Sequence, residues 1–321
     1  MVSFAWAFHR RKTLLCLVAV LVLCFPPIVS ATDVRAVLEP ATRLTEGEPF
    51  SPYAMPTDFT VRPSIFRTPN PARCKGITVD QPAILRLVAA CVDARGQIIP
   101  NCDVRLTLGA IPLSGGHDHD DPSRPTGTFT PAAGNTGPGG ILPVQYTAAE
   151  VSGIIEATLT GADAQGRPVT PAIATIGVRT GGLQPLPRVG AGFRVNSSRF
   201  HDFNNLFTTP TVNTKLQQLP GKFLNELVLN QAVLPSSVPT LVYTSMSLPE
   251  GGLFDIDRTW SPPHCSHRFG RDVDLDIESS IPDGFRRELS KVILNSGFFF
   301  PVVAESPANP ATKHWHLTSR N

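Results

Sequence analysis

Hydrophobic and polar residues alternate most regularly in a short stretch in the last third of the chain, residues 272–277. Its sequence is Asp-Val-Asp-Leu-Asp-Ile, the period of two that is typical of a strand with one polar and one apolar face. Asp272, Asp274 and Asp276 therefore share a face, and three neighbouring carboxylates repel one another. The pattern indicates that a cation or basic groups lie opposite them.

A second alternating stretch, residues 314–318, reads His-Trp-His-Leu-Thr. His314, His316 and Thr318 face one way, and the tryptophan and leucine between them face the other. If the two predicted strands lie side by side, these histidines join the aspartates on one face.

Histidine and aspartate on two such strands have the chemistry of a zinc site. Zinc prefers about four ligands, and catalytic sites usually take three from the protein and leave the fourth position to water. His267 and Asp274 stand on either side of Gly270, where a glycine allows the chain to turn tightly. We therefore expect one Zn²⁺ per chain on His267, Asp274 and His316, with His314 near the open position.

The spacing His-x-x-Gly-x-x-x-Asp, followed far downstream by His-x-His, resembles that of a group of zinc peptidases. The group includes penicillin-insensitive murein endopeptidases, D-Ala-D-Ala carboxypeptidases and dipeptidases, and lysostaphin-type enzymes. Residues 266–274, Ser-His-Arg-Phe-Gly-Arg-Asp-Val-Asp, are most similar to the murein endopeptidase branch, which also has a histidine three residues before the first ligand, matched here by His264. The resemblance covers roughly the last third of the chain.

This resemblance implies an exported zinc metallopeptidase that hydrolyses peptide bonds in peptidoglycan cross-links or stem peptides, with His314 acting on the water or on the transition state. His314 is either the catalytic base or a support for the ligands. His264 is a candidate second ligand, a substrate contact or a loop residue. Asp272 and Asp276 are candidates to orient a ligand histidine.

The substrate stays open because relatives with D-Ala-D-Ala activity carry an arginine after an earlier strand. This sequence has no clear match to that arginine, and Arg258 and Arg271 are no more than candidates for its role. Cys265, between two histidines, is a less favoured ligand candidate, since the predicted triad is complete without it.

The beginning of the chain has the pattern of a secretory signal. Residues 9–12 are His-Arg-Arg-Lys, residues 14–25 are apolar, and residues 29–31 are Val-Ser-Ala. We expect a signal peptide in residues 1–31, cleaved after Ala31, and export to the periplasm or the outside with no membrane attachment afterwards; an uncleaved anchor is the alternative. The formal net charge of +2 over 321 residues gives no reason to expect a nucleic-acid partner.

Short apolar runs separated by turn residues predict an all-β region in residues 74–180, typical of a β-sandwich. This region is similar to a bacterial immunoglobulin-like domain, whose partner the sequence does not name. The predicted strands cover residues 84–92, 104–108, 141–146, 154–159 and 172–178. Residues 32–73, rich in proline, threonine and serine, predict a linker or loosely packed arm.

Two features of this region carry further hypotheses. Disulfides persist in an oxidising compartment, and Cys91 and Cys102 flank a turn-like segment, so they are the first candidate pair. Residues 117–121, His-Asp-His-Asp-Asp, are a candidate metal loop, a solvated loop, or a loop that folds back over the zinc cleft.

The remaining segments predict a linker in residues 181–192 and a zinc peptidase domain in residues 193–321. Helices are expected in residues 212–218, 221–231 and from 282–283 to Gly297, strands in 241–248 and 298–303, and loops in 249–263 and 304–312. The predicted fold class is thus multidomain: an all-β immunoglobulin-like sandwich followed by an α+β zinc peptidase domain with a central antiparallel sheet. The alternative function is a cell-surface binding or adhesion protein whose zinc site is structural or vestigial.

Overall fold

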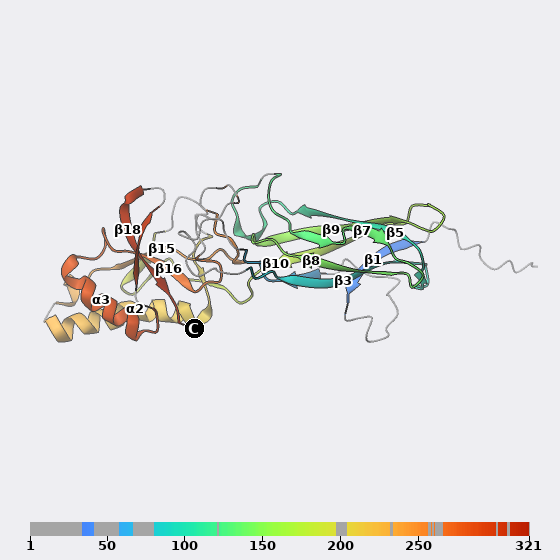
Figure 1. Ribbon diagram of the computed structural model, residues 1–321. Helices are drawn as coiled ribbons and strands as arrows, with labels where there is room; N and C mark the ends of the chain where they lie inside the picture. The colour runs from blue at the N-terminus through green and yellow to red at the C-terminus, as the bar shows by residue number, and fades with distance from the viewer. Residues whose placement is uncertain are drawn as a thin grey trace, which may run out of the picture. The chain divides into compact units, whose positions relative to one another are not determined.

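The protein is mostly β-sheet with few helices, as its computed structural model shows (Figure 1). The structure describes residues 34–41, 58–66, 80–120, 122–196, 204–231, 234–255, 258, 260, 266–299, 301–306 and 309–320. The predicted signal peptide, His264 and Cys265 lie outside them. All described residues belong to one compact unit, Thr32–Asn321, and none of their helices is long and apolar enough to span a membrane.

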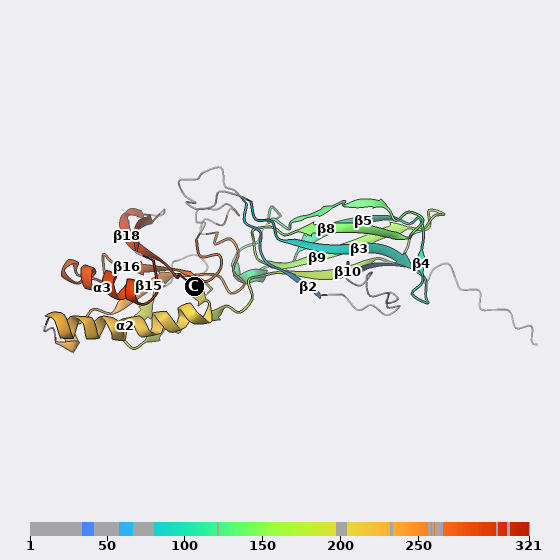
Figure 2. The same ribbon diagram turned by 60° about the horizontal axis from the view of Figure 1, so that its bottom comes forward.

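Two five-stranded sheets enclose the first cluster of buried residues. They lie face to face (Figure 2) around a core that includes Leu87, Tyr146, Leu159 and Ile176. The first sheet has the order β1 (Arg35–Pro40), β3 (Ile84–Val92), β8 (Ile141–Thr147), β6 (Thr128–Thr130), with β4 (Ile98–Ile99) beside β3. The second has the order β2 (Asp58–Val61), β10 (Ala172–Val178), β9 (Gly153–Ala162), β5 (Asp103–Ala110), β7 (Ala133–Asn135).

The five strands predicted in this region are confirmed. Burial alternates along β9 and β5 because each has one face toward the shared core. β3 departs from alternation, since its last six residues are all buried. Val88, Ala90 and Val92 form a second cluster with Val37 of β1, on the other face of the sheet.

Parts of the expected linker are strands. β1 pairs antiparallel with β3 along its whole length, and β2 pairs parallel with β10. The apolar run of β1 is only three residues long, Ala36–Leu38, and lies among proline, threonine and serine, a composition that favours a linker. The β-sheet region therefore begins before residue 74.

A third sheet carries the two alternating stretches. Its strands, in spatial order, are β12 (Val189–Gly190), β13 (Phe193–Val195), β15 (Leu241–Ser245), β16 (Asp272–Asp276), β18 (Asn309–Thr318) and β17 (Val302–Ser306). The pairing of β13 with β15 is parallel, so the sheet is not wholly antiparallel as expected. A small separate pair is formed by β11 (Gln184–Pro185) and β14 (Phe207–Thr208), and short 3-10 helices lie at Ser114–Gly116 and Pro235–Ser237.

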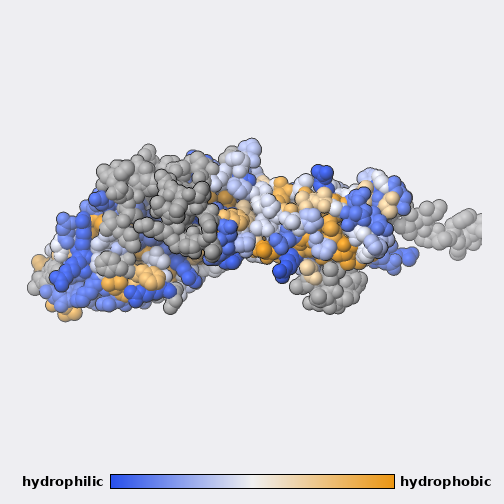
Figure 3. Space-filling view, viewed as in Figure 1, coloured by the Kyte–Doolittle hydropathy of each residue, from blue (hydrophilic) through white to orange (hydrophobic). Residues whose placement is uncertain are grey.

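Helices α2 (Pro210–Gln231) and α3 (Asp283–Asn295) pack against the third sheet and form a second large hydrophobic core with it. Leu216 and Phe223 of α2 and Leu289 of α3 pack with Val273 and Leu275 of β16. The two helices run side by side in both ribbon views (Figures 1 and 2). Their visible outer surface is mostly hydrophilic (Figure 3), as expected of helices with one apolar face turned inward.

Helix α2 is continuous, although two shorter helices were expected on either side of Pro220. A proline inside a helix leaves the carbonyl four residues earlier without its usual amide donor. That carbonyl belongs to Leu216, and the buried Tyr243 hydroxyl donates to it at 3.0 Å. A side chain from β15 thus replaces the missing hydrogen bond, which the local sequence does not reveal.

The C-terminal hairpin also differs from expectation. Residues 304–312 were expected to form a loop, but they include the end of β17 and the start of β18, which pair antiparallel. Their prolines and small or polar residues are typical of a loop, whereas the pairing comes from backbone hydrogen bonds that composition does not determine. The strand expected in residues 298–303 begins at Val302 instead.

Candidate metal centre

The pairing of β16 with β18 brings the predicted residues together. In the antiparallel register Asp274 lies opposite His316, Asp276 opposite His314, and Asp272 opposite Thr318. The intervening apolar residues of both strands are buried in the core beneath the helices. Because side chains alternate between the two faces of a strand, the aspartates of β16 and the histidines of β18 lie together on the face of the sheet that points away from this core.

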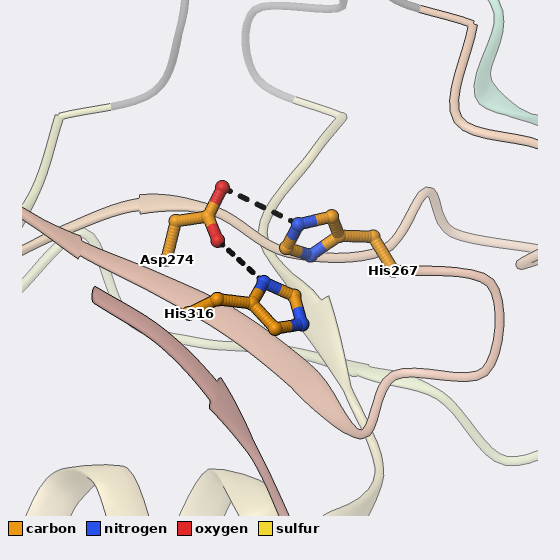
Figure 4. Close-up of side chains that lie close together, drawn as sticks. All are labelled: His267, Asp274 and His316. Atoms are coloured by element: carbon orange, nitrogen blue, oxygen red, sulfur yellow. Dashed lines mark hydrogen bonds and ion pairs between the residues drawn. The ribbon is translucent and has the colours of Figure 1, made fainter. Parts of the chain in front are cut away.

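The carboxylate of Asp274 lies between two imidazoles (Figure 4). Its Oδ2 is 3.3 Å from Nε2 of His267, and its Oδ1 is 2.9 Å from Nδ1 of His316. One ligand atom from each residue lies within 4.8 Å of the others, in the only such group among the residues that the structure describes. His267 is 1% exposed and Asp274 is 5% exposed. This buried group could hold a metal ion.

His267 reaches the site from a tight loop that precedes β16. Its backbone is left-handed, with φ 66°, and so is that of Gly270. A Cβ at Gly270 would lie 2.6 Å from the side chain of Leu183 and 2.9 Å from the amide nitrogen of Thr209. Only glycine fits this turn, as the sequence predicts.

Asp272 connects three groups around the site. Its carboxylate accepts the backbone N–H of His267 at 3.2 Å and the Thr318 hydroxyl at 2.7 Å. Its Oδ1 also lies 3.4 Å from Nε2 of His316. Burial alone would raise the pKa of Asp272, but the hydrogen bond with His316 and the nearby charge of His267 lower it. Asp272 therefore has the contacts expected of a group that orients both histidines.

The pKa values of Asp274 and His316 are shifted strongly by the charges around them. Burial alone would raise the pKa of the Asp274 carboxyl, but His267 and His316, with a smaller effect of His314, hold it well below its usual range. Burial alone would lower the pKa of His316, but hydrogen bonds and charge from Asp272 and Asp274 raise it to about 10. The carboxylate is thus kept ionised, and the imidazole must lose a proton before it binds a metal.

The other predicted site residues occupy different places. His314 belongs to the site, since its Nε2 is 3.4 Å from Oδ2 of Asp274 and its side chain is 15% exposed. The Asp276 carboxylate instead accepts hydrogen bonds from the turn after β16, including the Ser279 hydroxyl. Arg271 is exposed. Arg258 pairs with Asp118 at 2.6 Å.

In the described part of this loop, residues 117–120, the two histidines are packed, whereas Asp118 and Asp120 are exposed. His117 is buried, and its ring lies edge-on to Trp260 with centroids 5.0 Å apart. The ring of His119 stacks near the same indole at 4.2 Å and its Nε2 is 3.3 Å from Asp255. In the described part of the chain these two histidines belong to no metal-binding group. Through Asp255 and Trp260 the loop contacts the segment in residues 249–263 that was also expected to form a loop.

Cys91 and Cys102 come together as the turn between them predicts. Both are buried and are free thiols in the structure. Burial raises the pKa of each thiol, and a thiol–thiol hydrogen bond raises that of Cys91 further. The disulfide between them stays a prediction.

The sequence did not single out several groups next to the site. Phe254 lies edge-on to the His267 ring, with centroids 5.9 Å apart, and Arg268 pairs with Glu150 at 2.6 Å. Thr318 could have been recognised as a partner of Asp272, because alternation puts it on the histidine face. No spacing links Arg268 to a residue 118 positions away.

No family model matches this chain, and no curated protein is similar enough to it to count as a match. The candidate site therefore rests on its own geometry: two imidazoles and one carboxylate that can hold a metal ion, with a third imidazole beside them.

Proposed function

We propose that the protein is an exported zinc-dependent peptidase that hydrolyses peptide bonds in peptidoglycan cross-links or stem peptides. The observation that carries this proposal is the convergence of His267, Asp274 and His316 on one point, with His314 beside them. Two imidazoles and a carboxylate are a donor set that suits zinc, and three protein ligands leave a position open. The motif resemblance described above supports peptide hydrolysis as the reaction.

The proposed architecture is an immunoglobulin-like sandwich followed by an α+β peptidase domain. The first two sheets and their shared core support the former. The third sheet, with both helices on one face and the histidines on the other, supports the latter.

The roles of the residues follow from their contacts. Bound zinc would supply a water of lowered pKa and polarise a substrate carbonyl. His267, Asp274 and His316 would hold the ion, and Asp272 would fix the orientation of both histidines. His314 would take and return the proton at Nε2, because it shares the site's face and reaches solvent.

The test uses the full chain after metal analysis. We expect one zinc per molecule, hydrolysis of purified peptidoglycan or of muropeptides, and loss of hydrolysis when a chelator removes the zinc. Mass spectrometry of the products would identify the bond cleaved. A protein that binds zinc fully but releases no product from any peptide substrate would contradict the enzymatic proposal.

A second candidate function is a binding or adhesion protein with a structural metal. The specific observation in its favour is burial, since His267 and Asp274 are almost inaccessible and structural sites are closed. This candidate predicts that chelation lowers the melting temperature while partner binding by the β-sheet region continues and no hydrolysis occurs.

A further inference from the structure

We propose that Glu150, a residue between β8 and β9, is a positioning residue for the metal site. It acts through Arg268, which directly follows His267 in the chain. The β-sheet region before residue 180 would then be part of the scaffold that holds a metal ligand, and not a separable spacer. This inference rests on the metal site of the proposed function and adds a residue to it.

The first observation is a buried ion pair. The guanidinium of Arg268 lies 2.6 Å from Oε1 of Glu150, and the two side chains are 2% and 17% exposed. The same Oε1 accepts the backbone N–H of Phe66 at 3.0 Å. A buried guanidinium needs its carboxylate partner, because an unpaired charge in such a place is strongly unfavourable. Arg268 is therefore fixed to Glu150.

The second observation is a set of backbone hydrogen bonds at the same place. The Glu150 carbonyl accepts the N–H of Leu253 at 2.9 Å, and the Arg268 carbonyl accepts the N–H of Gly252 at 2.9 Å. The Ser152 hydroxyl donates to the Gly251 carbonyl at 2.6 Å. The segment at residues 251–253 thus lies between the chain near Glu150 and the chain that carries His267.

The third observation is the close packing of residues 251–253 between the chain near Glu150 and the chain that carries His267. Gly251 and Gly252 have left-handed backbones, with φ 71° and 75°. A Cβ on Gly251 would lie 2.6 Å from the Arg268 carbonyl oxygen, and one on Gly252 would lie 2.7 Å from the Ser152 amide nitrogen. The segment at residues 251–253 is thus closely packed against the backbones of Arg268 and Ser152, which limits movement of Arg268 relative to the chain near Glu150.

The consequence concerns His267. It lies in a loop, its backbone is left-handed, and its ring must meet Asp274 on β16. Its own N–H is held by the Asp272 carboxylate at 3.2 Å, and the next residue, Arg268, is held by Glu150, so the backbone of His267 has little freedom. Loss of the charge on Glu150 would release one of these two constraints.

The experiment compares Glu150→Gln with Glu226→Gln in the full chain. Glutamine keeps the shape of glutamate and removes its charge, and Glu226 forms an exposed ion pair with Lys291 at 2.7 Å that serves as a matched control. Zinc affinity is measured on folded protein by competition with a chromophoric chelator. We expect Glu150→Gln to bind zinc about 10–100-fold more weakly, as for other groups that orient ligands, and Glu226→Gln to bind like the parent.

Two further measurements keep the test decisive. Glu150→Asp keeps the negative charge, but its side chain is one methylene shorter, so the carboxylate lies farther from Arg268. This variant should fold, and its zinc affinity should be several-fold lower than that of the parent. Arg268→Gln combined with Glu150→Gln should weaken zinc binding by no more than the larger single effect, because both changes remove the same constraint. Equal zinc affinity in the parent, Glu150→Gln and Glu150→Asp would overturn the inference and leave the zinc site intact.

Amide hydrogen exchange separates this inference from the proposed function. In the metal-free protein, residues 266–271 should exchange faster in Glu150→Gln than in Glu226→Gln. If the parent binds no zinc, the proposed function fails, yet faster exchange in this segment would still support the positioning role of Glu150. Unchanged exchange would refute it.

Discussion

Two regions of this molecule contain the pattern His-x-His together with aspartates, and they have different structures. In β18, His314 and His316 lie on one face of a strand, and both approach the same Asp274 carboxylate. In the loop at residues 117–120, His117 and His119 pack on Trp260 instead. Spacing alone does not make a metal site. The backbone that carries the spacing decides whether the imidazoles converge.

The physical difference is the partner strand. A strand places residues two apart on one face, and β16 then supplies carboxylates at matched positions. Among the residues that the structure describes, no strand pairs with the loop. The backbone that leads into it is left-handed at Leu113 and Gly115, and the rings of its two histidines are nearly perpendicular, at 89°. One region therefore makes a donor set and the other makes an aromatic contact.

The largest expected effect separates these two regions directly. His316→Ala removes one of three zinc ligands, which should weaken zinc binding by at least on the order of 100-fold and abolish hydrolysis. His119→Ala should leave zinc stoichiometry unchanged. Metal analysis after dialysis checks both variants. Retention of stoichiometric zinc by His316→Ala would contradict the ligand assignment.

The next effect concerns the two histidines of β18 itself. His314→Ala should keep its zinc, because the three ligands remain, but hydrolyse peptides about 100–10,000-fold more slowly, the usual range for removal of a general acid or base. Steady-state kinetics with zinc analysis of the same sample checks this. Loss of zinc from this variant would instead make His314 a ligand.

A pH effect of intermediate size is expected for the metal-free protein. The raised pKa of His316, about 10, contributes stability that is complete below the unfolded value of about 6.5 and is lost as the pH rises through about 10. The lowered pKa of Asp274 contributes stability above about pH 4, lost as the pH falls further. Stability should thus fall from pH 6.5 to 10, by at most about 1.4 kcal/mol per pH unit.

Denaturant unfolding at several pH values measures this slope. His316→Ala should flatten the alkaline decline, and His119→Ala should not. Added zinc should reverse the trend between pH 6 and 8, since the ion binds the neutral imidazole and competes with its proton. A metal-free protein whose stability is constant from pH 6.5 to 10 would refute the coupling of His316 to the two aspartates.

The smallest expected effect sharpens the role of the groups around the ligands. Thr318→Val removes the hydroxyl that donates to Asp272 and keeps the side-chain shape. Zinc affinity should fall by about 10-fold, the low end for groups that orient ligands. Thr107→Val, on the distant strand β5, is the matched control. Chelator competition on both variants provides the comparison.

The sequence predicted the candidate site better than the surrounding fold. Alternation in residues 272–277 and 314–318 correctly gave the two faces, because side-chain direction in a strand depends on local geometry alone. Gly270 was recognised for the same reason. The pairing of Glu150 with Arg268 could not be predicted, since its two residues are 118 positions apart and no local pattern links them.

The errors in the fold have a common physical cause. Pro220 and the segment 304–312, with its prolines and small residues, were interpreted from their local preferences, and contacts with other segments overrode both. Tyr243 supplies a hydrogen bond for the helix, and β17 supplies one neighbour for β18. Local preference is a weak prior wherever a distant group can satisfy the backbone.

The Tyr243 hydroxyl has one further consequence. Tyr243 lies on β15 directly opposite Leu275 of β16, and its phenol ends at the carbonyl of Leu216 in the middle of α2. The same residue thus ties the strand next to the Asp274-bearing strand to the one point where the helix would otherwise bend. A bend of α2 at Pro220 would therefore have to break this hydrogen bond or displace β15, the strand that pairs with the Asp274-bearing β16.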